Sequence, residues 1–262
     1  PALLAQINAT GYALTLGLHT RIDETIAQVV EQSRAGNVYV NRNMVGAVVG
    51  VQPFGGEGLS GTGPKAGGPL YLLRLLSQRP DDAAIRSVEG IGPVAPEALL
   101  RGVQLGARGV ASGARSGAAS AAGAAVPAQT DAALQALQSW AAQQPRADFA
   151  ALAPVFAQMA AQSPCTAARL LAGPTGEANL YAVSPRERVL CLAMDACDRL
   201  LQLGAVLAVG SHAIWPADAQ ELYAELPDEA RQRIELTLDW THDSETFDAV
   251  LHHGSEAALR EL

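Results

Sequence analysis

The sequence predicts an α/β protein built from two units that a linker separates. Residues 14–41 and 188–209 each contain an apolar strand, an amphipathic helix and a second strand with short joints, the pattern of a parallel βαβ unit. Between them, 19 of the 27 residues in 102–128 are Gly, Ala or Ser. Such a segment buries too little apolar surface to offset its ordering entropy, so a flexible linker or long surface loop is expected. The predicted first domain, linker and second domain cover residues 1–101, 102–130 and 131–262.

The first unit is predicted from its hydrophobic periodicity. Residues 14–20 indicate a buried strand, residues 22–35 a helix that Gly36 ends, and residues 38–41 a second strand. Residues 46–63 are too rich in glycine for a regular element. We therefore expect an ordered loop whose backbone needs positive φ or approaches another group closely.

The second unit is predicted to begin with two amphipathic helices whose N-caps are Asp131 and Asp148. A strand, a helix that Gly204 ends, and another strand follow in α/β order. Two further helices, a last short strand and a helix opened by Gly254 and Ser255 complete the unit. The expected elements cover residues 131–143, 149–162, 188–193, 195–203, 205–209, 219–225, 228–235 and 247–251.

Charge and cysteine usage exclude several classes of function. The net charge is −8, and residues 218–262 carry 12 acidic and 3 basic side chains. Without a block of Lys and Arg, neither nucleic acid nor an anionic membrane surface is an expected partner. Cys165, Cys191 and Cys197 lack metal-ligand spacing, as do the histidines, so no metal site is expected and the thiols are typical of a reduced cytoplasmic protein.

The sequence indicates neither a membrane span nor a dinucleotide fingerprint. No apolar run reaches the length of a membrane span. The sequence begins without Met and on an apolar helical stretch, so we expect a fragment of a longer protein. Residues 56–61 match Gly-x-Gly-x-x-Gly, but they follow Pro53 and Phe54 and run into more glycines. A dinucleotide fingerprint should lie between a strand and a helix, so this match is rejected.

A wider pattern is more specific. Residues 36–42, 52–56 and 59–63 resemble the C-terminal end of the aldehyde dehydrogenase catalytic domain. Residues 45–54, with Gly-Gly-Pro-Leu-Tyr-Leu-Leu-Arg at 67–74, are similar to glutamate-γ-semialdehyde dehydrogenases, in particular to the dehydrogenase half of the bacterial proline utilization A family. The resemblance covers roughly residues 1–80.

The resemblance implies a function for the longer protein. It would carry out FAD-dependent oxidation of proline, then NAD-dependent oxidation of L-glutamate γ-semialdehyde (pyrroline-5-carboxylate) to glutamate, as a cytoplasmic homo-oligomer. The family's catalytic Cys and Glu lie upstream of Pro1, so the resemblance places no catalytic residue in this chain, and the fragment is expected to be inactive. A DNA-binding module occurs in some members, outside this segment.

Three residues are implied to contact the substrate. Gly46 and Ala47 fall where the family's loop presents backbone N–H groups to the substrate carboxylate, and such groups form an anion-binding concavity. Phe54 falls where an aromatic ring packs on the aliphatic part of the substrate. The structural alternative is a tight turn with Phe54 plugging the core.

The second unit resembles the cofactor domain of an aldehyde dehydrogenase in residues 173–179, 185–186, 189–191 and 207–210. Ile214-Trp215-Pro216 stands where the family has a Lys-Pro for the adenosine ribose, and Ala193-Met194-Asp195 replaces its Trp-Asn-aromatic-Pro turn. We therefore expect a degenerate Rossmann-like accessory domain, incomplete at its C-terminus, that keeps the fold and has lost the cofactor. Its role would be structural: it would cover either a tunnel that carries the reaction intermediate or the edge at which a partner binds.

Two alternatives remain open. The chain could be a non-catalytic assembly module that reuses the aldehyde dehydrogenase fold, or a general aldehyde dehydrogenase fused to an unrelated domain. The carboxylate-anchoring pattern argues against the second. An upstream reading frame with a Gly-x-Cys loop would favour the enzyme over the module.

Overall fold

The computed structural model describes residues 2–78, 80, 82–89, 131–166, 168–243 and 245–260, which form two compact units. The first unit holds the described residues up to 89 together with residues 168–182, and the second holds residues 131–166 and 183–260. Residues 168–182 thus group with the first unit, although the sequence places them within the second domain. The predicted linker lies outside the described residues.

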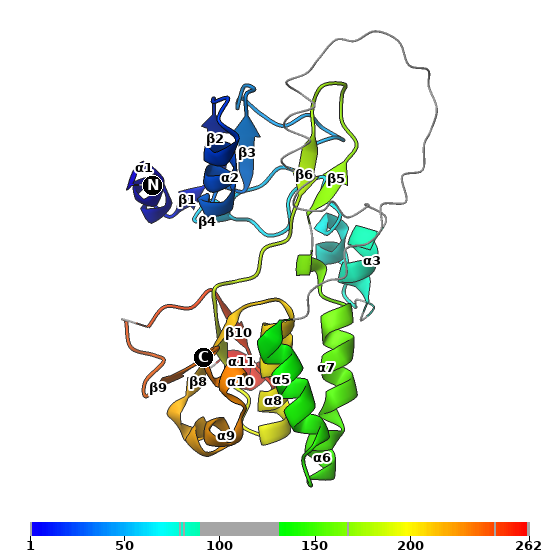
Figure 1. Cartoon of the computed structure of the whole chain (residues 1–262), viewed down its shortest axis with the longest axis vertical. Helices are drawn as coiled ribbons and strands as arrows, with labels where there is room; N and C mark the ends of the chain where they lie inside the picture. Colours follow the sequence, from blue (N-terminus) through cyan, green and yellow to red (C-terminus); the bar gives the residue numbers. More distant parts are fainter. Residues whose placement is uncertain are drawn as a thin grey trace. The chain divides into compact units, whose positions relative to one another are not determined.

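The first unit is a set of short strands and helices joined by long loops (Figure 1). Its strands form three two-stranded sheets: β1 with β4 and β5 with β6 are antiparallel, and β2 with β3 is parallel. The elements are α1 (Ala2–Ala9), β1 (Tyr12–Ala13), β2 (Thr15–Leu18), α2 (Asp23–Gln32), β3 (Asn37–Val40), β4 (Glu57–Gly58), η1 (Tyr71–Leu75), α3 (Ala83–Glu89), β5 (Arg169–Leu171) and β6 (Asn179–Tyr181).

The predicted βαβ unit is confirmed in β2, α2 and β3. The two strands run parallel from the pair Thr15 and Asn37 to the pair Leu18 and Val40. Helix α2 buries Ile26 and ends at Gln32, three residues before the predicted boundary, because Ser33 is already extended. The carboxyl ends of both strands therefore meet at one edge, where the glycine-rich segment begins.

The second unit is a parallel sheet with packed helices. Its four strands have the order β10-β7-β8-β9, and all three neighbouring pairs are parallel. The elements are α5 (Ala132–Ala142), α6 (Ala147–Ala150), α7 (Leu152–Ala161), η2 (Pro164–Thr166), β7 (Arg188–Cys191), α8 (Ala196–Ala208), β8 (His212–Pro216), η3 (Ala217–Ala219), α9 (Gln220–Glu225), α10 (Asp228–Arg231), β9 (Ile234–Thr237), β10 (Ala249–Leu251) and α11 (Glu256–Arg260).

The core of the second unit lies between its helices and its sheet. Helices α5, α7 and α8 pack on one another, and fully buried side chains from them meet the buried residues of β7 and β8. Trp215 of β8 and Phe156 of α7 are among the largest of these side chains, each with 0% exposure. Burial of this kind supplies most of the stability of an α/β domain.

The predicted end of the helix at Gly204 is wrong. Helix α8 continues through Gly204 to Ala208, so residues 205–209, predicted as a strand, are mostly helical, and the next strand is β8. Gly204 is buried against α7: a Cβ there would lie 2.5 Å from Cδ1 and Cε1 of Phe156. The glycine therefore permits close helix packing rather than ending the helix.

The predicted cap at Asp131 is confirmed, because its carboxylate accepts from the Ala133 N–H at 2.8 Å. Two other predicted helix boundaries are wrong. Asp148 is not an N-cap; it lies in the first turn of α6, where Arg146 holds its carboxylate at 2.7 Å. The helix predicted over residues 228–235 ends at Arg231, since Ile234 begins β9 and pairs with β8.

Candidate functional site

The candidate site is the glycine loop, which we define as residues 46–56. It follows β3 at the carboxyl edge of the parallel pair. Asn41, the residue after β3, has a φ of +56° and ties this edge together: its side-chain amide donates to the Thr20 carbonyl at 2.9 Å and accepts from the Thr20 N–H at 3.0 Å. Its own backbone N–H donates to the Leu18 carbonyl at 2.8 Å. The loop therefore starts from a fixed point.

The first part of the glycine loop is a closed turn. The Gln52 backbone N–H donates to the Val48 carbonyl at 2.9 Å, and the Val48 N–H donates to the Gln52 side-chain Oε1 at 3.0 Å. Gly50, within the turn, has a φ of +80°, a conformation that L side chains rarely adopt. Both polar backbone groups of Val48 are thus held by one residue.

Gly46 and Ala47 precede this turn and are half-buried. Among the described residues, none accepts a hydrogen bond from the backbone N–H of either one. A Cβ built on Gly46 meets nothing within 4 Å, so the space beside it is open. Two adjacent N–H groups without partners, next to open space, are suited to bind an anion such as a carboxylate.

The second part of the glycine loop is clamped by Asn37 of β3. The Asn37 amide donates to the Pro53 carbonyl at 2.8 Å and accepts from the Gly55 N–H at 3.1 Å. The chain passes so close that a Cβ on Gly36 would lie 2.1 Å from the Gly55 carbonyl oxygen. This clamp fixes the residues on both sides of Phe54.

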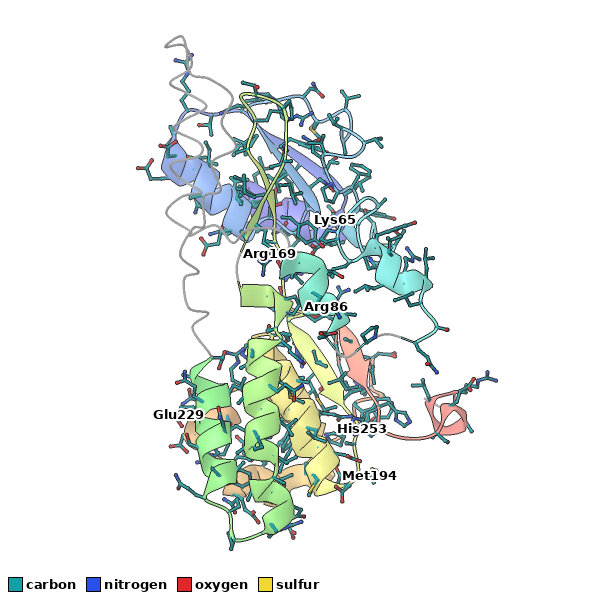
Figure 2. The ribbon with its side chains drawn as sticks, turned by 90° about the vertical axis from the view of Figure 1, so that its right-hand side faces the viewer. Lys65, Arg86, Arg169, Met194, Glu229 and His253 are labelled. Carbon is teal, nitrogen blue, oxygen red and sulfur yellow. The ribbon has the colours of Figure 1, made fainter. Side chains whose placement is uncertain are left out.

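Phe54 lies in an antiparallel bridge, with its backbone N–H and carbonyl bonded to Ala66 at 3.0 and 2.9 Å. It is half-buried. Lys65, labelled in Figure 2, reaches back to donate to the Gly36 carbonyl, and burial lowers its pKa. The structure therefore places Gly46 and Ala47 side by side, and it places Phe54 on the same loop between the two residues that Asn37 clamps.

The hairpin β5–β6 adds residues that sequence reasoning missed. The Gln52 Nε2 donates to Asn179 Oδ1 at 3.0 Å and to Glu177 Oε2 at 3.3 Å. Glu177 also pairs with Arg42 at 3.3 Å, and the Arg42 guanidinium lies 5.1 Å from the centre of the Tyr39 ring. Glu177 and Asn179 belong to a segment whose sequence resembles a cofactor domain, so no local signal pointed to this contact.

None of the three cysteines is suited to act as a nucleophile. Burial raises the pKa of Cys191 to about 12, and burial raises that of Cys165. Burial and the Asp148 carboxylate, which accepts from the Cys197 thiol at 3.4 Å, raise the pKa of Cys197. A nucleophilic cysteine needs a lowered pKa, and all three lie in the second unit.

The second unit does not fit a dinucleotide at the carboxyl edge of its sheet. Asp195 caps α8 by accepting from the Cys197 and Asp198 N–H groups at 2.8 and 3.3 Å, which occupies the helix end that would face a pyrophosphate. Arg199 donates to the Ala193 carbonyl at 2.8 Å and is only 4% exposed. The Asp195 carboxylate places a negative charge at this helix end, and the Arg199 side chain is already bonded within the unit, so neither favours a bound pyrophosphate.

The described ranges offer neither a metal centre nor a membrane span. No group of three or more His, Cys, Asp or Glu there is arranged to hold a metal ion. His253, labelled in Figure 2, has its Nδ1 atom 3.4 Å from Oδ1 of Asp198. No described helix is long and apolar enough to span a membrane.

Parts of this chain, and the chain as a whole, are similar to known proteins. Residues 2–79 match the aldehyde dehydrogenase family. The bifunctional protein PutA of Escherichia coli K12 is 48% identical over 268 residues, which is 100% of this chain and 18% of that protein. The 1-pyrroline-5-carboxylate dehydrogenase of Bacillus subtilis 168 is 48% identical over 71 residues, 27% of this chain and 14% of that protein.

A solved structure also shares the fold. Proline utilization A from Corynebacterium freiburgense aligns with 99% of this chain and 20% of its own, with a TM-score of 0.50 and 18% identity. The chain as a whole is therefore similar to a region of PutA proteins, and it spans only 18% of the length of the curated PutA from E. coli.

Proposed function

Residues 2–79 belong to the aldehyde dehydrogenase family, and from that premise we propose that the glycine loop binds the α-carboxylate of an amino-acid semialdehyde. The reaction is the NAD-dependent oxidation of L-glutamate γ-semialdehyde to glutamate. In the longer protein it follows FAD-dependent oxidation of proline. This chain supplies the end of the pocket opposite the reacting aldehyde.

The observation that carries the proposal is the pair of N–H groups on Gly46 and Ala47, to which the described part of the chain offers no acceptor. Two backbone donors aimed at one anion give charge-assisted hydrogen bonds, and they avoid the cost of burying a cationic side chain. Phe54, further along the same loop, packs on the aliphatic part of the substrate. The loop is tied at Val48 and clamped by Asn37, so its donors are already in place before the substrate arrives.

The chemistry itself belongs to residues outside this chain. In the proposed reaction a cysteine thiolate attacks the aldehyde and a glutamate activates the water that releases the product, while NAD accepts the hydride. The raised pKa values of all three thiols support an inactive fragment. The acidic, capped end of α8 supports a second unit that holds no NAD and serves as an accessory domain.

Steady-state kinetics of the full-length protein test the proposal. Gly46→Val places its side chain in the open space beside Gly46, where the substrate carboxylate would lie, and its Cβ meets no other residue, so the variant blocks the carboxylate rather than the fold. We expect the KM for glutamate semialdehyde to rise about 10- to 100-fold, the loss typical of one or two hydrogen bonds to a charged group. Propanal, which lacks a carboxylate, should keep its KM. An equal rise for both aldehydes would mean that the loop is structural.

A further inference from the structure

We propose that the hairpin β5–β6 positions the substrate-binding part of the glycine loop, and that Glu177 and Asn179 do so by fixing the orientation of the Gln52 side-chain amide. Both segments belong to the first compact unit. The inference rests on the proposed function, since it concerns the loop that holds the substrate carboxylate. It assigns a role in substrate affinity to two residues that lie 125 and 127 positions from Gln52.

The contacts of Gln52 use both ends of its amide. The Oε1 atom accepts from the Val48 N–H at 3.0 Å. The Nε2 atom donates to Asn179 Oδ1 at 3.0 Å and to Glu177 Oε2 at 3.3 Å. One end of the amide therefore faces the glycine loop and the other faces the hairpin.

Orientation matters because a side-chain amide has two different ends. If the Gln52 amide turned by half a revolution, its NH₂ group would face the Val48 N–H, and two donors would oppose each other. A carboxylate can only accept, so Glu177 favours the orientation in which the Gln52 NH₂ points to the hairpin. The hairpin thus selects the state in which Val48 is held.

Val48 follows directly after the two N–H groups proposed to bind the carboxylate. Gln52 holds it twice, once by its backbone N–H at 2.9 Å and once by its side chain. Losing the second tie frees the Val48 amide and the residues before it, so the two donors must be ordered again when substrate binds. Glu177 and Asn179 are therefore positioning residues and need no contact with the substrate.

The ion pair between Glu177 and Arg42 also reduces the repulsion of an anionic substrate. A lone carboxylate close to a carboxylate-binding loop would repel an anionic substrate. Glu177 is paired with Arg42 at 3.3 Å, which offsets its charge. Because changes at Glu177 alter charge as well as hydrogen bonding, neutral substitutions at Gln52 and Asn179 give the cleaner test.

The experiment is a mutant cycle in the full-length protein, with KM and kcat measured for glutamate semialdehyde and for propanal. Asn179→Ala and Gln52→Leu should each raise the KM for the semialdehyde about five- to tenfold, with kcat changed by less than about twofold and propanal unaffected. Leu180→Ala, on the same strand and 43% exposed, is the matched control and should leave both substrates unchanged. Combined with Gln52→Leu, Asn179→Ala should add nothing.

Several results would overturn the inference. Additive effects of Asn179→Ala and Gln52→Leu would mean that the hairpin does not act through Gln52. An unchanged KM in Asn179→Ala, or an equal rise for both aldehydes, would also refute it. If Gly46→Val does not discriminate between the aldehydes, the proposed function itself fails; if it does and the cycle of Asn179 and Gln52 fails, only the role of the hairpin is wrong.

Discussion

Gly204→Ala should destabilise the second unit, although alanine normally favours a helix. The substitution gains about 1 kcal/mol of helix propensity. Its Cβ would lie 2.5 Å from two ring carbons of Phe156 and 3.2 Å from Met159 Sδ, whereas carbon atoms pack best at about 3.5–4.0 Å. Phe156 is fully buried, and overpacking of such a core costs about 1–3 kcal/mol. The net expectation is a loss of about 1 kcal/mol.

Urea unfolding followed by tryptophan fluorescence measures this effect on the second unit alone, because Trp140, Trp215 and Trp240 all belong to it. Ala205→Gly, one residue further along the same helix, is the control that measures helix propensity alone. It should lower the free energy of unfolding by about 1 kcal/mol. In a Phe156→Leu background the ring edge is gone, so Gly204→Ala should become stabilising. A stabilising effect of equal size in both backgrounds would refute the packing argument.

The remaining predictions concern the thiols and a helix cap. Burial raises the pKa of Cys191 to about 12, so its thiolate is nearly absent at pH 8. Iodoacetamide should therefore label Cys197 in the native protein long before Cys191. Equal labelling of the two thiols, measured by mass spectrometry, would contradict the burial of Cys191. Asp131→Ala removes the cap of α5 and the pairing with Arg233 at 3.1 Å, so unfolding should become easier by about 1–2 kcal/mol, with Asp131→Asn losing less. Equal losses in both variants would exclude a capping role.

Much of the fold follows from local pattern. The period of apolar residues predicted the βαβ unit of β2, α2 and β3, and the side chain of Asp131 predicted the start of α5, because both signals act within a few residues. The predicted helix end at Gly204 was wrong because the role of this glycine depends on Phe156, which lies 48 positions earlier and packs against it. In isolation, a glycine followed by apolar residues is typical of a helix end.

The site divides in the same way. The glycine density of residues 46–63 predicted an ordered loop, whereas the clamp by Asn37 was found only in the structure. The contact between Gln52 and the hairpin could not be predicted, since it joins polar residues of common type across more than a hundred positions. No periodicity or spacing encodes such a pair. It depends on how residues 168–182 pack within the first unit.

We propose above that the backbone N–H groups of Gly46 and Ala47 hold the substrate carboxylate. The ratio of KM values for glutamate semialdehyde and propanal, compared between the full-length protein and its Gly46→Val variant, tests it most directly. We expect this ratio to rise at least about tenfold. An unchanged ratio, whatever happens to the absolute rates, would contradict it.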